Sequence, residues 1–164
     1  NKFVKFNYDE SRRDDIEKRL GFSLDDNYVL CQTGYRVGYS LCNLKIDYNE
    51  ILQKLEPDCK VVLMDFSTQR LNDSYSNFEN DNHTKIEISD IRDQSVLIEY
   101  ANRCIFFTEG HLRSHTYLPP MFGKDVDVVA SNKILSLPES PIEFWNNNVF
   151  LFNGKMIKHV YETL

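Results

Sequence analysis

Two short stretches of the chain combine glycine with a residue type that binds phosphate. The stretch QTGYRVGY (32–39) follows an apolar run and contains Arg36, and the stretch TEGHLRSH (108–115) follows another and contains Arg113. Glycine lets backbone N–H groups approach a ligand closely, and an arginine can bind a phosphate group through two parallel hydrogen bonds. We therefore predict a phosphate-binding pocket built from these two stretches. The plainer interpretation is that Gly34 and Gly110 only form turns and that the two arginines lie on the surface.

The second stretch also carries groups that can move protons or bind a metal. His111 and His115 are four residues apart and would share a helix face, a spacing that can hold a metal ion together with Glu109 or Cys104. The metalloprotease pattern, however, requires a glutamate directly after the first histidine, and Leu112 stands there. Glu109 comes directly after an apolar run, so it is either an acid at a helix start or a carboxylate with a shifted pKa. The residues alone leave both interpretations open.

Alternating helix and strand patterns predict the scaffold that positions these residues. Helices are expected over residues 11–20, 47–56, 93–102 and 111–118, and strands over 27–33, 60–66, 84–88, 104–108 and 126–130. Ser11 is expected to cap the first helix and Pro119-Pro120 to end the last, while the polar residues 67–82 are expected to form a loop with at most one helical turn. Asn153-Gly154 predicts a hairpin turn. The predicted fold is a single α/β domain over residues 1–164, with a Rossmann-like, mostly parallel sheet in its core (27–131), helices on both faces and a small C-terminal hairpin.

Composition and charge exclude several classes of function. The chain has 19 basic and 25 acidic side chains and a net charge of −6, which disfavours general nucleic-acid binding. The basic pairs Arg12-Arg13 and Lys18-Arg19 lie among acids, a pattern typical of a solvated helix face. No apolar run approaches the roughly 18 to 20 residues that span a bilayer, and no signal peptide is evident. The four cysteines lack a metal-binding spacing and favour a reducing, cytoplasmic compartment, and no metal or cofactor is predicted. Because the chain begins at Asn1 in place of a methionine, it is expected to be either a fragment or a processed product.

The order of these elements resembles that of a known family. A strand ends in a glycine loop in VLCQTGYR, a helix and an apolar strand follow in YNEILQKLEPDCKVVLMDF, and a helix leads into a strand in DQSVLIEYANRCIFF. A glycine and histidine loop then opens the next helix in TEGHLRSHTYLPPMFGKDVDVVAS. Over residues 27–131 this layout is similar to the C-terminal, donor-binding half of GT-B-type glycosyltransferases. The likeness lies in the layout and one loop, without a diagnostic motif.

What the resemblance implies is a pocket for a nucleotide-sugar donor. It assigns donor binding to Thr33, Gly34, Arg36, Thr108, Gly110, Arg113 and His115, and candidate catalytic roles to Glu109 and His111. Glu109 departs from the family, which has glycine or serine there, and a carboxylate at that place would bind sugar hydroxyls in preference to phosphate. The acceptor is not indicated, and the N-terminal half that normally contacts it would have to come from an upstream domain or a partner chain.

Three hypotheses therefore follow from the sequence. The first is a glycosyltransferase domain that transfers a sugar from a nucleotide diphosphate donor. The second is a non-catalytic α/β interaction module of a larger assembly, which the missing half, the acidic balance and the aromatic tail (Phe144, Trp145, Phe150, Phe152) allow. The third is a metal-dependent hydrolase that uses His111 and His115.

Overall fold

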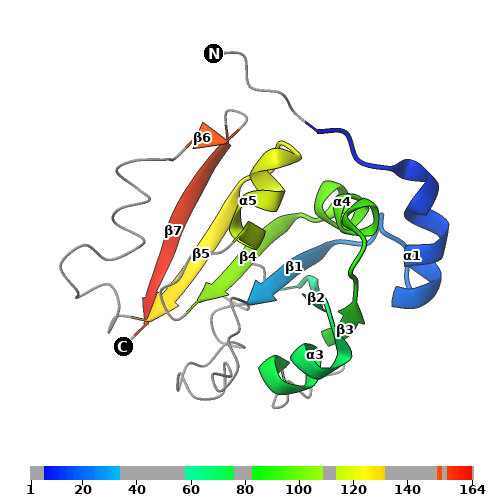
Figure 1. Cartoon of the computed structure of the whole chain (residues 1–164), viewed down its shortest axis with the longest axis horizontal. Coiled ribbons are helices and arrows are strands. Elements are labelled where there is room, and N and C mark those ends of the chain that lie inside the picture. Colours follow the sequence, from blue (N-terminus) through cyan, green and yellow to red (C-terminus); the bar gives the residue numbers. More distant parts are fainter. Residues whose placement is uncertain are drawn as a thin grey trace.

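The computed structural model describes residues 6–33, 58–75, 83–108, 114–131, 151–152 and 155–163. Figure 1 shows a twisted sheet with helices packed against it. The strands are β1 (Tyr28–Thr33), β2 (Lys60–Asp65), β3 (His83–Glu87), β4 (Arg103–Thr108), β5 (Val126–Ser131), β6 (Leu151–Phe152) and β7 (Lys155–Thr163). The helices are the short 3-10 helix η1 (Glu10–Arg12) and α1 (Arg13–Leu20), α3 (Thr68–Tyr75), α4 (Ile91–Tyr100) and α5 (Ser114–Met121).

The strands are ordered β3-β2-β1-β4-β5-β7-β6 across the sheet. Every pairing from β3 to β7 is parallel, and β6 is antiparallel to β7. The prediction of a Rossmann-like, mostly parallel α/β sheet is thereby confirmed. The pairing of Phe152 with Lys155 also confirms the small C-terminal hairpin around residues 153–154.

Helices cover both faces of the sheet. The chain moves outward from β2 to β3 through α3, and it moves back across the sheet from β3 to β4 through α4 and then on to β5 through α5. Because such crossovers are right-handed, connections running in opposite directions place their helices on opposite faces. Leu71 of α3 is accordingly buried outside the core cluster to which α4 and α5 contribute.

The main core lies between the sheet and the layer formed by α1, α4 and α5. Alternate strand residues point into it, and helix side chains meet them there, as expected for a pleated strand packed against amphipathic helices. The buried members include Tyr28, Leu30, Val62, Met64, Ile86, Cys104 and Phe106 from the strands and Ile16, Leu20, Val96 and Leu97 from the helices. The other strand face is buried as well, at Val29, Cys31, Val61, Leu63, Ile105 and Phe107. Continuous burial on both faces explains why β1, β2 and β4 read as unbroken apolar runs.

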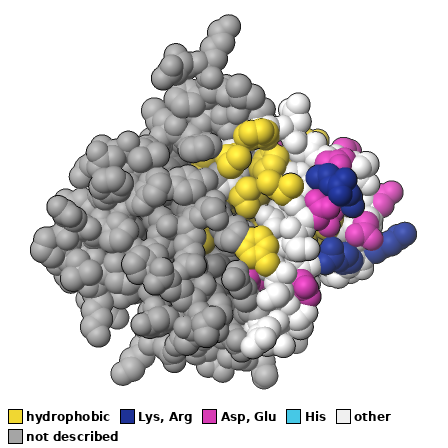
Figure 2. Space-filling model, viewed as in Figure 1, with side chains coloured by type: hydrophobic (Ala, Val, Ile, Leu, Met, Phe, Trp, Pro, Cys, Tyr) yellow, Lys and Arg dark blue, Asp and Glu magenta, His cyan; other side chains and the backbone are white. Residues whose placement is uncertain are grey.

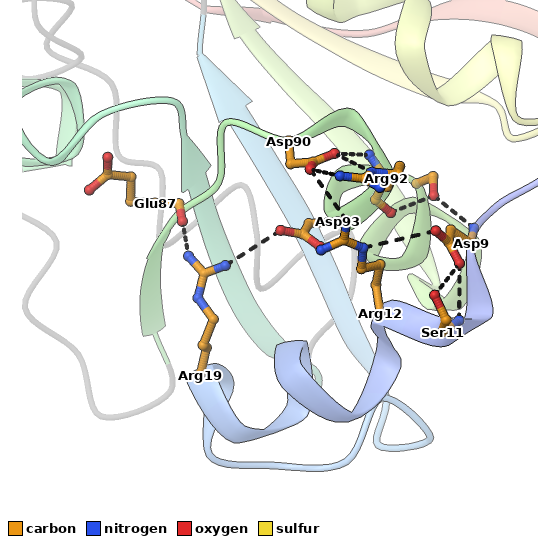
Figure 3. A network of polar contacts seen from close by, with 9 residues as sticks. Asp9, Ser11, Arg12, Arg19, Glu87, Asp90, Arg92 and Asp93 are labelled. Atoms are coloured by element: carbon orange, nitrogen blue, oxygen red, sulfur yellow. Dashed lines mark hydrogen bonds and ion pairs between the residues drawn. The ribbon is translucent and has the colours of Figure 1, made fainter.

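The N-terminal helix is fastened to α4 by a network of ion pairs (Figure 3). Arg12 lies 3.6 Å from Asp90 and 3.9 Å from Asp93, and Arg19 lies 3.7 Å from Asp93. Figure 2 shows Lys and Arg side chains intermingled with Asp and Glu side chains on this part of the surface. Both arginine side chains remain partly exposed among acids, as expected of a face of mixed charges, and their guanidinium groups also connect η1 and α1 to the start of α4.

Two helix starts differ from the sequence prediction for a common reason. Ser11 does not cap α1, which follows Arg12 without a side-chain cap; Asp9 instead caps the 3-10 helix η1 that leads into α1, because its carboxylate accepts a hydrogen bond from the Ser11 backbone N–H at 3.1 Å. Asp90 likewise accepts from the Arg92 N–H at 2.9 Å, so α4 begins at Ile91, two residues before the predicted start. In both places an aspartate provides the cap by accepting a hydrogen bond from the backbone N–H of the residue two positions after it.

Two further predictions were wrong about where helices lie. Residues 68–75 form the helix α3, whereas a loop with at most one helical turn was expected. The double proline lies inside α5, which continues through it to Met121. Pro119 and Pro120 still act as acceptors through their carbonyl groups, which receive hydrogen bonds from Lys124 and Gly123, and Gly123 turns the chain at φ 79°. A proline near the end of a helix removes donors but leaves these acceptors in place.

Within the described residues, none of the helices combines the length and the apolar character that a membrane crossing requires.

Candidate functional site at the β1–β4 switch point

The strand order reverses between β1 and β4. From β1 the chain proceeds to β2 and β3 on one side, and it then returns to β4 and β5 on the other. Thr33, the last residue of β1, pairs with Phe107, so the carboxyl ends of β1 and β4 lie side by side (Figure 1). Ligands of open α/β sheets bind in the crevice outside such a switch point, because the chain diverges there in opposite directions.

This topology places the starts of both glycine stretches on the same side of the sheet, at the carboxyl ends of its parallel strands. Thr33 ends β1 and Thr108 ends β4, and their strands are hydrogen-bonded neighbours. Adjacent strands are about 4.8 Å apart, so loops that leave these two ends begin within the span of a diphosphate group. His115 is the second residue of α5, the helix that follows β4. The other predicted site residues, Gly34, Arg36, Glu109, Gly110, His111 and Arg113, lie outside the described residues.

A further polar residue lies at the carboxyl end of a neighbouring strand. Asp65 ends β2, directly after the buried residues of that strand, and only 7% of its surface is exposed. Its Oδ1 atom accepts a hydrogen bond of 2.6 Å from the Phe66 backbone N–H. Because the register of β1 and β2 pairs Cys31 with Leu63, Asp65 lies level with Thr33 on the neighbouring strand.

Asp65 was not among the residues predicted from the sequence, although the signal was present. It follows four buried residues, Val61 to Met64, in the same way that Glu109 follows the apolar run of β4. A carboxylate at the carboxyl end of a buried strand is expensive to bury and therefore marks a position worth testing for function. Its relevance depends on strand order, which places β2 beside β1.

The end of β3 is tied to the helix layers on both faces of the sheet. Glu87 pairs with Asp65 in the β2–β3 register, and its carboxylate accepts a hydrogen bond from the hydroxyl of Thr68 at the start of α3. The Glu87 carbonyl accepts another from Arg19 of α1 (Figure 3). These contacts fix the carboxyl ends of β2 and β3, so the edge that carries Asp65 is preorganised.

No family model, curated protein or solved structure matches this chain significantly. The candidate site is therefore argued from its residues and from the position of the switch point.

A cleft lies at the opposite side of the sheet, by the amino ends of β4 and β5. It has a volume of about 300 Å³ and is lined by residues that follow α4 and α5 and by the starts of β4 and β5, among them Arg103, Lys124 and Asp127. Its charges are used within the protein: Arg103 lies 3.4 Å from Asp127, and the Lys124 ammonium group donates to the Ala101 carbonyl at 3.5 Å. Lys124 thus neutralises the carbonyl end of α4, a structural role expected of a cation at a helix C-terminus.

Metal binding has no candidate ligand cluster in the part of the chain that the structure describes, where no three His, Cys, Asp or Glu side chains converge. Of the predicted histidine pair, His115 belongs to α5 and His111 precedes the first residue of that helix, Ser114. His111 lies outside the described residues, so the expectation that both share one helix face stays a prediction.

Proposed function

We propose that this domain binds a nucleotide-sugar at the β1–β4 switch point and serves as the donor-binding half of a glycosyltransferase. The observation that carries the proposal is the pairing of Thr33 with Phe107 in adjacent parallel strands. It brings together the origins of the two stretches that contain glycine and arginine, which are 75 residues apart in the chain (33 to 108).

The chemistry of these stretches fits a nucleoside diphosphate. Backbone N–H groups near Gly34 and Gly110 would bind the diphosphate oxygens, and Arg36 and Arg113 would add charge-assisted hydrogen bonds. In sugar transfer the bond between the anomeric carbon and the diphosphate breaks, and negative charge develops on the departing phosphate. Guanidinium groups of Arg36 and Arg113 held beside the departing phosphate would stabilise that charge more strongly than the charge on the bound donor, which would lower the barrier.

The remaining predicted residues have roles in the same scheme. His111 or His115 would lie beside the sugar or the leaving phosphate, where an imidazole can donate a proton. Glu109 would accept hydrogen bonds from sugar hydroxyls, because a carboxylate repels phosphate. Transfer would require an acceptor hydroxyl held by an upstream domain or a partner chain, whose oxygen would form the new bond to the anomeric carbon while a base of that domain or chain takes its proton.

The first test measures thermal stability in the presence of UDP, GDP, ADP, CDP and their glucose or mannose conjugates. We expect at least one of them to raise the melting temperature, because a ligand that binds only the folded state stabilises it. Arg36→Ala and Arg113→Ala should each weaken binding by about tenfold or more, the usual loss for a hydrogen bond to a charged group.

The matched control is Arg103→Ala. Arg103 begins β4, at the opposite edge of the sheet from the end of the same strand that leads to Arg113. This variant removes an equal charge and should leave the nucleotide-induced shift unchanged. If no nucleotide shifts the melting temperature of the wild-type protein, the donor-binding proposal is wrong and the interaction-module hypothesis remains.

A further inference from the structure

We propose that β3 is a self-association surface, at which two copies of this chain pair their edge strands antiparallel and join their sheets into one. The partner that the surface fits is therefore a second copy of the protein. The inference is independent of nucleotide binding, because it uses only the outer strand of the sheet and the charges that this strand carries.

The outer side of β3 is open to a further strand. β3 stands at one end of the strand order and is hydrogen-bonded to β2 on its inner side (Figure 1). Among the described residues, no strand pairs with its outer side. An edge strand presents a row of N–H and C=O groups that can template the addition of another strand. Such an addition would leave the existing strand pairs unchanged.

Two hydrogen bonds show which residues of β3 direct their backbone groups outward. Directly after the strand, the Ile88 N–H donates to the Asp65 carbonyl of β2 at 2.9 Å, so the even-numbered residues face β2. The Glu87 carbonyl instead accepts from Arg19 of α1, outside the sheet. Because the backbone groups of successive strand residues point to alternate sides, those of Lys85 and Glu87 point outward.

The charges on β3 favour one register of a two-fold pairing. Lys85 and Glu87 are both exposed, and they flank the buried Ile86. An antiparallel pairing whose two-fold axis passes at Ile86 places Lys85 of each copy opposite Glu87 of the other. These are hydrogen-bonded positions, because both residues direct their backbone groups outward. Oppositely charged side chains at directly opposed positions stabilise the pairing of two strands.

The same charges disfavour the neighbouring registers. An axis at Lys85 would place the two copies of Lys85 opposite each other, and an axis at Glu87 would do the same with two carboxylates. Like charges directly opposed across strands destabilise the pairing. An axis at Thr84 would place Lys85 opposite His83, which offers it no negative charge. The charge pattern thus sets the register both by attraction and by repulsion.

The contacts already made at this edge leave room for the pairing. Arg19 donates to the Glu87 carbonyl, and the Thr68 hydroxyl donates to the Glu87 carboxylate. A carbonyl oxygen has two lone pairs and a carboxylate about four acceptor sites, so each can also accept from Lys85 of a second copy. Because the paired strands run antiparallel, the switch points of the two copies would face opposite directions.

The test measures self-association by sedimentation equilibrium at protein concentrations from about 1 µM to about 1 mM, the range in which weak complexes form. The paired strands are short, so we expect a wild-type dimer that dissociates on dilution. Lys85→Glu and Glu87→Lys should each weaken this dimer by about tenfold or more, because each places like charges opposite one another. The double variant exchanges the two charges and should regain the wild-type dimer.

Two comparisons separate the edge pairing from general charge effects. Glu87→Lys makes the net charge of −6 less negative, so a weaker dimer cannot result from general repulsion. Lys18→Glu is the matched control, because Lys18 is an exposed lysine of α1, and this variant should leave the dissociation constant unchanged. Melting temperatures show whether each variant is folded.

Three results would overturn the inference. The first is a wild-type protein that stays monomeric up to about 1 mM. The second is a pair of single variants that dimerise as strongly as the wild-type protein, which would place any dimer contact elsewhere. The third is a folded double variant that associates no more strongly than the single variants.

Discussion

Asp90 shows how one carboxylate organises the junction between α1 and α4. It accepts a hydrogen bond from the Arg92 N–H, pairs with the Arg92 guanidinium at 2.7 Å and lies 3.6 Å from Arg12 (Figure 3). The hydrogen bonds from the Arg92 side chain, followed by that from its backbone, lower the pKa of Asp90 well below its usual value. The ionised form is therefore the one that the folded protein stabilises.

This shift predicts a pH-dependent contribution of Asp90 to stability. Because folding lowers the pKa, the contribution is fully present above the unfolded value of about 3.9 and is lost as the pH falls through the folded value. Asp90→Asn should therefore lower the urea midpoint at pH 7, and its difference from the wild-type protein should shrink below about pH 4. Circular dichroism during urea denaturation at pH 7, 5 and 3 measures this. A difference that stays constant with pH would show that the charge is irrelevant.

Asp90→Ala provides the comparison at the same position. It removes the cap as well as the charge, whereas asparagine keeps an oxygen for the Arg92 N–H. Its urea midpoint at pH 7 should therefore lie below that of Asp90→Asn, and this second difference should persist at low pH.

At the scale of elements, α1 completes a helix layer that the βαβ units leave unfinished. The connections through α4 and α5 cover part of one sheet face, and the core residues of β2 and β3 on that face also need a partner. Ile16 and Leu20 of α1 enter this core cluster with Leu24, while Arg19 binds the end of β3. The N-terminal segment is therefore an integral part of the fold.

This packing predicts a large effect for a substitution in α1. Ile16 is fully buried, so Ile16→Ala should lower the free energy of unfolding by about 2–5 kcal/mol. Ile91, at the start of α4, is 52% exposed, and Ile91→Ala should cost less than about 1 kcal/mol. Chemical denaturation of both variants measures the difference. Similar losses for the two substitutions would mean that α1 is not packed as described.

At the scale of the whole molecule, β1 is an interior strand of the sheet. It is hydrogen-bonded to β2 on one side and to β4 on the other, and both of its faces are buried. β3 stands at one end of the strand order and carries exposed residues at Lys85 and Glu87. The strand that we expect to be well protected from hydrogen exchange therefore ends at the switch point.

Hydrogen exchange should follow this arrangement. We expect the backbone amides of Leu30 and Cys31 to exchange at least about tenfold more slowly than those of Thr84 and Lys85, because central strands open only when the domain unfolds. Exchange measured by NMR on the native protein tests this. Equal rates in the two strands would show that the sheet opens as one unit from edge to edge.

Local sequence patterns determined most of the strands. The runs that form β1, β2, β4 and β5 were predicted to within one residue at each end. For β1, β2 and β4 the reason is that burial on both faces demands unbroken apolar residues. The helix α3 was missed for the opposite reason. Its residues, TQRLNDSY, include Asn, Asp and Ser, which favour turns, and its contacts with β2 and β3 form only after those strands have paired.

What the sequence by itself determined about this protein is a set of α/β elements and two glycine stretches with arginine at strand ends. Only the tertiary structure decided that β1 and β4 are neighbours, that β2 brings Asp65 to the same edge, and that Arg12 and Arg19 bind α4. The physical reason is that hydrophobic periodicity shows which face of an element is buried but carries no information on which strand lies beside it. Strand order is set by hydrogen bonds and packing between residues far apart in the chain.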